Sequence, residues 1–177
     1  RAADFDAQRC GLAGDGQLNT TAAFKIPDLD AGQDVNGLTV SFSLKIFSSG
    51  TAGQGISVNF GAVPESNGDG ELGWPLPGGM TVAFETYGAQ PTGEIQGAIV
   101  VYANNSLVSR YPMTFVNDTG FRSALIRYDA QGLDVRWNNA DVAVNLPLPG
   151  FAPAIGHRVA LSARTGAAAS QELAIDS

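Results

Sequence analysis

The chain has 177 residues, 44% hydrophobic and 15% charged, which is too apolar for a disordered protein and too often interrupted by polar residues for a membrane-spanning one. Its net charge is −7 and its ten basic residues are scattered, which argues against nucleic acid as a partner, because phosphate binding depends on clustered Lys and Arg. No apolar run approaches the roughly 20 residues that cross a bilayer, so we expect no membrane insertion.

Alternating apolar and polar residues predict β-strands along most of the chain. The clearest example is residues 38–46, where five apolar residues alternate with four polar ones, so that all five lie on one face of a strand. The same period recurs in six further segments, with apolar members Ile56, Val58 and Phe60; Met80, Val82 and Phe84; Ile99 and Val101; Leu133, Val135 and Trp137; Val142, Val144 and Leu146; and Val159, Leu161 and Ala163.

The 22 Gly and nine Pro residues punctuate the chain too often for long helices and suit short strands joined by turns. One-sided strands need a second apolar layer, and without an amphipathic helix that layer is another sheet. The sequence therefore predicts an all-β, two-sheet antiparallel sandwich. A chain of this length suits one domain, and it begins without Met, so we expect residues 1–177 to be a single domain excised from a larger protein.

Groups suited to catalysis are sparse. Cys10 and His157 are the only residues of their kinds, and neither lies in a nucleophile motif. Glu172 and Asp176 fall on one face of a strand beside the terminus, whereas glycosidases need two carboxylates facing each other across a cleft. We therefore expect no enzymatic activity, and a polysaccharide-cleaving enzyme is the least favoured alternative.

Two acidic clusters contain the oxygen ligands that calcium prefers. They are Asp28, Asp30, Asp34 and Asn36, and Asn67, Asp69 and Glu71. Neither has the spacing of an EF-hand loop, and such residues in loops are usually turn formers. We therefore expect no cofactor, with a structural calcium ion as the alternative.

The segment at residues 79–87, followed by residues 99–104, resembles two adjacent strands of legume-type lectins, an acidic, aromatic strand and an Ile/Val strand that ends in Asn. Residues 121–128, 129–132, 133–138, 145–151 and 159–166 are similar, in order, to the second half of the concanavalin A-like lectin/glucanase superfamily, including laminin-G-like modules. The resemblance spans residues 17–177. It implies a jelly roll whose front sheet and rim loops often bind sugars.

The sequence departs from the metal site that the resemblance implies. Legume-type lectins have two carboxylates, two residues apart on the acidic strand, but here the first position is Ala83 and only Glu85 remains. The family's metal-binding His after this strand has no equivalent. We therefore expect the lectin-type double metal site to be absent, so that any sugar is bound by hydrogen bonds and aromatic stacking.

A candidate sugar-binding surface follows from strand parity. If Val82 and Phe84 point inward, then Ala83, Glu85 and Tyr87 point outward, and by the same rule Val100, Tyr102 and Asn104 face the same exterior. Arg164 joins this surface from the end of its own strand. Aromatic, carboxylate, amide and guanidinium groups suit a glycan; the alternative is an ordinary half-polar sheet face.

Trp74 lies between Gly73 and Pro75, in a loop that the resemblance places at the rim near the sugar site. It is either a stacking platform for sugar or a plug that seals one end of the sandwich, whereas Trp137, in phase with Leu133 and Val135, is predicted to be core.

We therefore expect a non-catalytic carbohydrate-binding, lectin-like module of a secreted or cell-surface protein, located outside the cell. Its expected partners are a glycan or polysaccharide and neighbouring domains of the parent protein. The alternative is a structural or adhesive spacer without a sugar site. The Ala-rich, Lys-poor composition favours a bacterial source.

Overall fold

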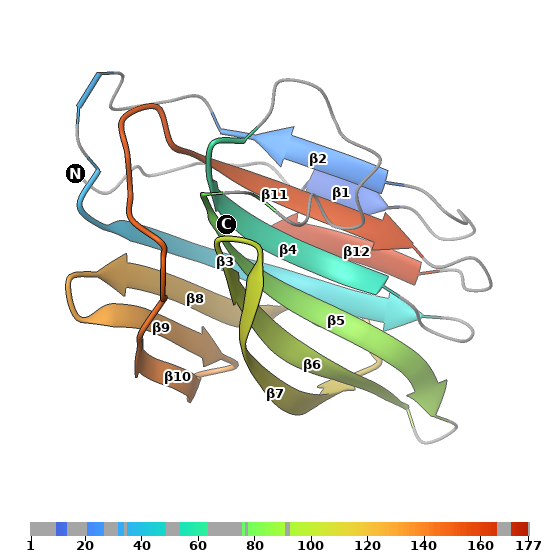
Figure 1. Cartoon of the computed structure of the whole chain (residues 1–177). Coiled ribbons are helices and arrows are strands. Elements are labelled where there is room, and N and C mark those ends of the chain that lie inside the picture. Colours follow the sequence, from blue (N-terminus) through green and yellow to red (C-terminus); the bar gives the residue numbers. More distant parts are fainter. Residues whose placement is uncertain are drawn as a thin grey trace.

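A computed structural model (Figure 1) describes residues 10–13, 21–26, 32–33, 35–48, 54–63, 76, 78–90, 93–165 and 171–176. Trp74 and, apart from Asn36, all the residues considered for calcium lie outside these ranges. The regular structure of the described residues is entirely β-strand, and none of it is a helix that could cross a membrane.

The described residues form twelve strands in two six-stranded sheets, and the two-sheet arrangement is the one that the sequence predicted. The back sheet contains, in spatial order, β1 (Cys10–Ala13), β12 (Gln171–Asp176), β3 (Leu38–Ser48), β8 (Arg122–Asp129), β9 (Gly132–Trp137) and β10 (Ala140–Leu146). The front sheet contains β2 (Thr21–Lys25), β11 (Arg158–Thr165), β4 (Gln54–Gly61), β5 (Met80–Gln90), β6 (Glu94–Ala103) and β7 (Ser106–Val116). Every neighbouring pair is antiparallel.

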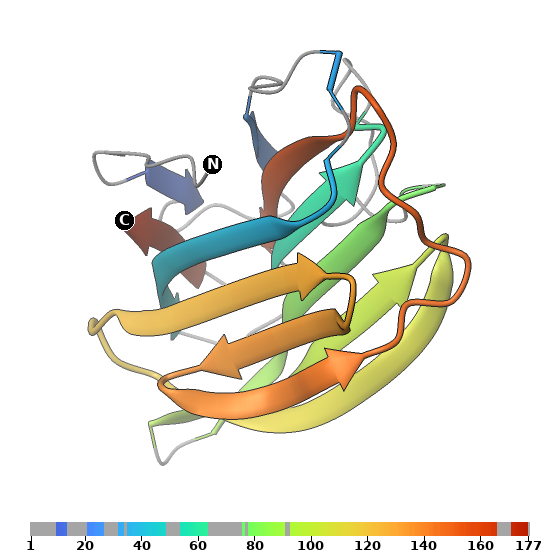
Figure 2. The ribbon, with the colours of Figure 1, turned by 90° about the vertical axis from the view of Figure 1, so that its left-hand side faces the viewer.

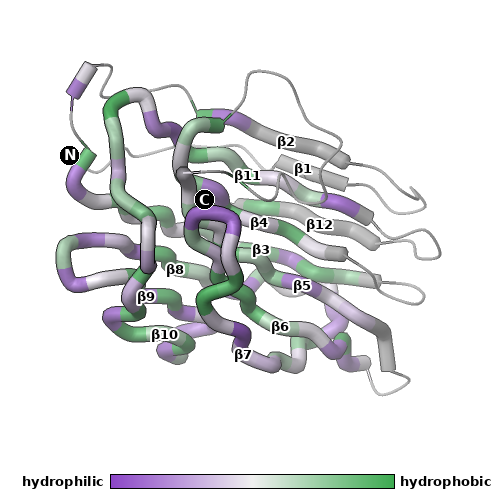
Figure 3. Tube along the Cα trace, viewed as in Figure 1, coloured by the Kyte–Doolittle hydropathy of each residue, from purple (hydrophilic) through white to green (hydrophobic). Residues whose placement is uncertain are grey.

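The two sheets stack face to face as the layers of a sandwich. In Figure 2 the blue and orange strands β3, β8, β9 and β10 lie in front of the green and yellow strands of the front sheet. Hydrophobic and hydrophilic residues alternate along many of the strands in Figure 3. The prediction of an all-β antiparallel jelly-roll sandwich is therefore confirmed.

Aromatic side chains from both sheets meet in the core. Phe84 of the front sheet packs edge-on against Phe42 of the back sheet, with ring centroids 6.1 Å apart. It also contacts Trp137, at 5.4 Å, and Trp137 in turn packs against Phe115, at 5.6 Å. Such tilted and edge-to-face pairs stabilise the fold beyond the area that they bury. The core position predicted for Trp137 is confirmed.

Strand β10 departs from the predicted alternation. Its pairing with β9 shifts register on both sides of Ala143, and each shift lets the strand change the face to which a residue points. Ala143 is consequently buried, while Val144 is 62% exposed. The prediction that Val144 points into the core is wrong, whereas Val142 and Leu146 do pack against the core.

The outer face of the front sheet is partly covered. Ala83 and Val100 belong to this face, as predicted, but they are buried, with 2% and 0% of their surface exposed, so strand parity gave their direction and not their exposure. Further along the same face, buried Asn59 donates to Ser57 Oγ (2.9 Å) and accepts from Thr81 Oγ1 (2.8 Å).

A small apolar cluster covers this part of the outer face. Val63 and Leu76 pack with Ala160 of β11, and Ala160 accepts a hydrogen bond from the buried Asn59 amide. Because Asn59 and its partners satisfy one another, they can be buried without losing hydrogen bonds. Among the described residues, exposed side chains lie on the part of this face formed by β5, β6 and β7, including Tyr87 and Arg110.

Replacing Phe84, which is 0% exposed, with Ala removes a ring that contacts both sheets. We expect Phe84→Ala to lower the free energy of unfolding by about 3–5 kcal/mol, because lost burial and the remaining cavity both destabilise the fold. Urea denaturation measures this difference. Val144→Ala is the matched control, and because Val144 is exposed it should change stability by less than about 0.5 kcal/mol; an equal loss in both variants would contradict this description of the core.

Candidate functional site

Four side chains on the outer face of the front sheet form what we call the Tyr87 cluster: Glu85 and Tyr87 of β5, Tyr102 of β6 and Arg110 of β7. The Tyr87 hydroxyl donates a hydrogen bond to Glu85 Oε2 and accepts one from Arg110 Nη2. Arg110 Nη1 lies 3.6 Å from Glu85 Oε2, and the guanidinium carbon lies 4.8 Å from the centre of the Tyr87 ring. The cluster thus joins an aromatic ring, a carboxylate and a guanidinium group.

Strand pairing brings these residues together. Glu85 pairs with Ala98 and Ala83 with Val100 across β5 and β6, and Val100 pairs with Arg110 across β6 and β7. Residues directly opposite each other in a sheet share a face, so Arg110 and Glu85 both stand above the buried side chains of Ala98 and Val100. The side chains that lie next to the cluster on β6 are therefore small, apolar and buried.

Gly55 is the residue of β4 that lies opposite Glu85, and it has no side chain. It pairs with Glu85 and has a φ of 148°, and a Cβ atom built on it would lie 1.9 Å from the Phe84 carbonyl oxygen. Only glycine fits this position, so β4 places no side chain directly opposite Glu85.

Both tyrosines of the cluster stay protonated at neutral pH. Burial raises the pKa of Tyr87 well above its usual value of 10.0, and the hydrogen bond to Glu85 raises it further. The pKa of Tyr102 is also raised, first by burial and then by the negative charge of Glu85. One carboxylate and one guanidinium remain as the charges, so the four side chains together carry no net charge.

Three of the predicted sugar-binding residues, Glu85, Tyr87 and Tyr102, belong to the cluster. Arg164 lies on the same face, since it pairs with Gly55 and Gly55 pairs with Glu85; two strand spacings put their backbones about 10 Å apart. Trp74 lies outside the described residues. Arg110 was not predicted, although Tyr111, Met113 and Phe115, which pack in or against the core, alternate with it and indicate its outward direction.

Asn104 belongs to a different part of the molecule. It lies in the turn between β6 and β7, six residues from Ala98, or about 20 Å along the strand. Its Oδ1 atom accepts a hydrogen bond from the Gly78 backbone N–H (3.1 Å). Asn104 and Asn105 have φ angles of 45° and 69°, as in the two-residue turns that favour Asn and Gly. The structure therefore gives Asn104 a role in the turn, away from the cluster.

His157 contributes to the core. Its ring packs edge-on against Phe60, at 5.7 Å, and stacks on Phe151, at 6.4 Å. Nδ1 accepts a hydrogen bond from the Ala154 N–H (3.2 Å), and burial lowers the pKa of the imidazole. The ring is thus a packing element, and burial favours its uncharged form.

The other candidate groups lie in the back sheet. Cys10 is in β1, and Glu172 and Asp176 of β12 pair with Phe47 and Ser43 of β3. Within the described part of the chain, no three His, Cys, Asp or Glu side chains gather in a way that could hold a metal ion.

Similar folds occur among solved structures. The Emp46p carbohydrate recognition domain in its potassium-bound form matches 94% of this chain and 79% of its own, with a TM-score of 0.65 and 12% identity. The VIP36 exoplasmic/lumenal domain with Ca²⁺ and Man3GlcNAc matches 95% of this chain and 77% of its own, with a TM-score of 0.64 and 16% identity. The legume lectin-like domain from Entamoeba histolytica matches 93% of this chain and 79% of its own, with a TM-score of 0.61 and 13% identity. The chain has a legume-lectin-like fold.

At these identities the likeness establishes the concanavalin A-like fold that the sequence suggested, and the chemistry must be argued from the residues. Scans of the sequence against protein-family models and curated proteins find no match.

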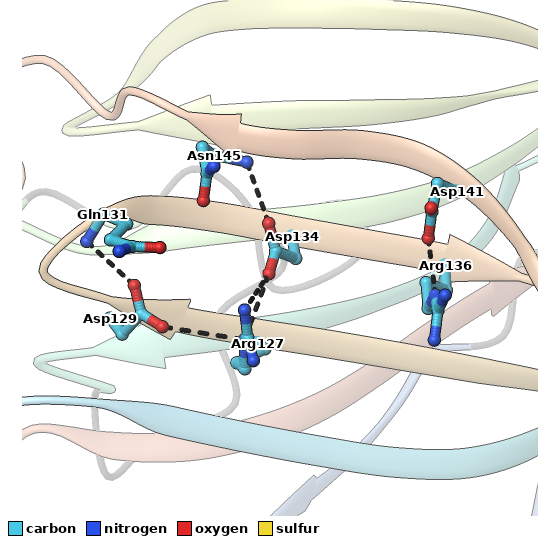
Figure 4. Close-up of polar contacts among 7 residues, drawn as sticks. All are labelled: Arg127, Asp129, Gln131, Asp134, Arg136, Asp141 and Asn145. Carbon is cyan, nitrogen blue, oxygen red and sulfur yellow. Dashed lines mark hydrogen bonds and ion pairs between the residues drawn. The ribbon is translucent and has the colours of Figure 1, made fainter.

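The back sheet of this lectin-like sandwich carries an ion-pair network on its outer face (Figure 4). Arg127 Nη2 donates to Asp134 Oδ2 (2.6 Å), and Asp134 Oδ1 accepts the backbone N–H of Asn145 (2.8 Å). Arg136 and Asp141 form a second pair across β9 and β10. These contacts connect β8, β9 and β10, and the network is therefore a structural feature of the sheet.

Asp134 should make stability depend on pH. Its pKa is lowered, first by the Asn145 N–H and also by Arg127, so the folded state binds this proton less tightly than the unfolded chain. The stabilisation is present above the usual value of 3.8 and is lost as pH falls through the lower folded pKa. We expect Asp134→Asn to lower the free energy of unfolding at pH 7 by about 0.2–1 kcal/mol.

Urea denaturation of both proteins at pH 7 and at several values below 3.8 tests this. The deficit of the variant should shrink in acid, and a deficit that stays constant with pH would show that the charge of Asp134 does not stabilise the fold.

Proposed function

We propose that this chain is a non-catalytic carbohydrate-binding module that binds a glycan or polysaccharide at the Tyr87 cluster. The observation that carries the proposal is Tyr87, a residue 46% exposed whose ring lies near a carboxylate and under a guanidinium on one face of a legume-lectin-like sandwich. Exposed aromatic rings pack against the C–H faces of sugars, while charged groups beside them bind hydroxyls.

The geometry of the cluster supports binding because the side chains are held in place before a ligand arrives. Tyr87 is fixed by its hydrogen bonds to Glu85 and Arg110, so little side-chain freedom remains to be lost on binding. Arg164, on the same face, would extend the surface for a longer oligosaccharide.

The structural comparisons support the same class of ligand. Solved structures with this fold include VIP36 with bound mannose-containing sugars and the lectin UEA-II complexed with galactose. VIP36 is described as an exoplasmic or lumenal domain, which supports an extracellular or cell-surface location for this module. In that setting the neighbouring domains of a parent protein would be its second kind of partner.

A binding role also fits the charges of the cluster better than hydrolysis. Glycosidases use two carboxylates, one as acid and one as base or nucleophile. Within the Tyr87 cluster Glu85 is the single carboxylate, and it faces Arg110 rather than a second acid.

A glycan array tests the proposal. We expect the folded chain to bind a defined set of glycans, and Tyr87→Ala to weaken that binding at least about tenfold, because the stacking surface is lost. The matched control is Val144→Ala, which truncates another exposed side chain on the other sheet and should leave binding unchanged.

Two results would contradict the proposal. If the folded chain binds no glycan, the spacer alternative replaces it. If Tyr87→Ala binds as tightly as the parent chain, the sugar is bound elsewhere on the molecule. Release of products from a bound polysaccharide would instead show that the chain is an enzyme.

A further inference from the structure

Resting on the carbohydrate-binding function proposed above, we infer that Glu85 and Arg110 together recognise two adjacent hydroxyl groups of an uncharged sugar, and that Arg110 supplies the positive charge that makes a metal ion unnecessary. The ligand class is therefore a neutral glycan with a vicinal diol, and Arg110 is the residue that determines specificity.

The first step of the argument is charge. The guanidinium of Arg110 is 3.6 Å from Glu85 Oε2, so it neutralises the one carboxylate of the cluster. A metal cation placed against Glu85 would be repelled by this guanidinium, and the neighbouring outward position on β5 is the methyl group of Ala83 rather than a second carboxylate. Calcium needs six to eight oxygen ligands, whereas here the Arg110 guanidinium would compete with it for the Glu85 carboxylate.

The second step is the hydrogen-bonding capacity that remains. The described contacts of the Glu85 carboxylate all involve Oε2, which leaves Oε1 able to accept a hydrogen bond. A guanidinium has five N–H donors, and Arg110 donates one of them to Tyr87. Its side chain is 47% exposed, so further donors can reach a ligand. An acceptor and a donor therefore stand side by side.

This pairing matches a diol. A hydroxyl can donate and accept, so one hydroxyl can donate to Glu85 while its neighbour accepts from Arg110. Hydrogen bonds to charged groups are stronger than those between neutral groups. Sugars that carry carboxylate or sulfate groups would gain Arg110 but would be repelled by Glu85, so the pair selects against them.

Some solved structures with this fold are described with a bound ion. VIP36 structures with sugar are described as Ca²⁺-bound and an Emp46p structure as potassium-bound. In this chain the cation beside Glu85 is a side chain, fixed by its contacts with Tyr87 and Glu85.

Calorimetric titration with the strongest neutral glycan from the array tests the inference. After dialysis against EDTA the parent chain should bind unchanged, and Arg110→Gln should bind at least about tenfold more weakly, because a charged donor is lost. Arg110→Lys should be intermediate, since it restores the charge without the planar set of donors. Arg136→Gln, which changes another exposed, ion-paired arginine, is the matched control and should bind like the parent.

Deoxy analogues of the same glycan test the diol with the parent chain alone. Removing either of one pair of adjacent hydroxyls should weaken binding about tenfold, while removing a hydroxyl elsewhere should have a smaller effect. This measurement applies even if an Arg110 variant does not fold.

Several outcomes would overturn the inference while leaving the proposed function intact. They are loss of binding in EDTA with recovery on adding calcium, full binding by Arg110→Gln when Tyr87→Ala is impaired, insensitivity to every single deoxy substitution, and a preference for carboxylated or sulfated glycans. If no glycan binds to the folded chain, both the function and the inference fail.

Discussion

The contact between the two sheets through Phe84 is the interaction on which the candidate site depends. Phe84 packs against Phe42 and Trp137 of the back sheet, which fixes the inward face of β5 in the core. Because side chains alternate along a strand, the same contact fixes Glu85 on the outward face, and Tyr87 follows at a register shift between Thr86 and Gly88. The orientation of β5 therefore determines both the packing of the core and the position of the Tyr87 cluster, and rotation of β5 would disturb both.

Strand alternation made most of the fold predictable from the sequence. The alternating apolar residues of 38–46, 56–60 and 80–84 lie in or against the core as their spacing indicates, because neighbouring side chains in a strand point to opposite faces of the sheet. The prediction fails at Val144, where two register shifts in β10 change the direction of the side chain. Bulges depend on how a strand pairs with its partner, so they cannot be predicted from the hydrophobic alternation of one segment.

Exposure was harder to predict than direction. Ala83 and Val100 point away from the core and yet are buried, as are the partners of Asn59. The cover near Asn59 comes from Val63 and Leu76 packing on Ala160, and these residues are far apart in the sequence. A parity argument divides the two faces of a sheet correctly, but it cannot tell which part of the outer face is covered by another segment.

The alternation of Tyr111, Met113 and Phe115 indicates that Arg110 points outward, but it does not indicate which residue Arg110 pairs with. The turn at Asn104 and Asn105 pairs Ala103 with Ser106, and a regular hairpin continued from that pair would place Arg110 opposite Ile99, which points into the core. The register shift at Val101 and Tyr102 adds one residue to β7, so that Arg110 pairs with Val100 instead. A one-residue shift moves a side chain to the other face of a sheet, and here it turns a guanidinium from the core toward Glu85. The position of Arg110 in the Tyr87 cluster thus depends on this bulge, and a second register shift lies in β5 between Thr86 and Gly88, at Tyr87 itself.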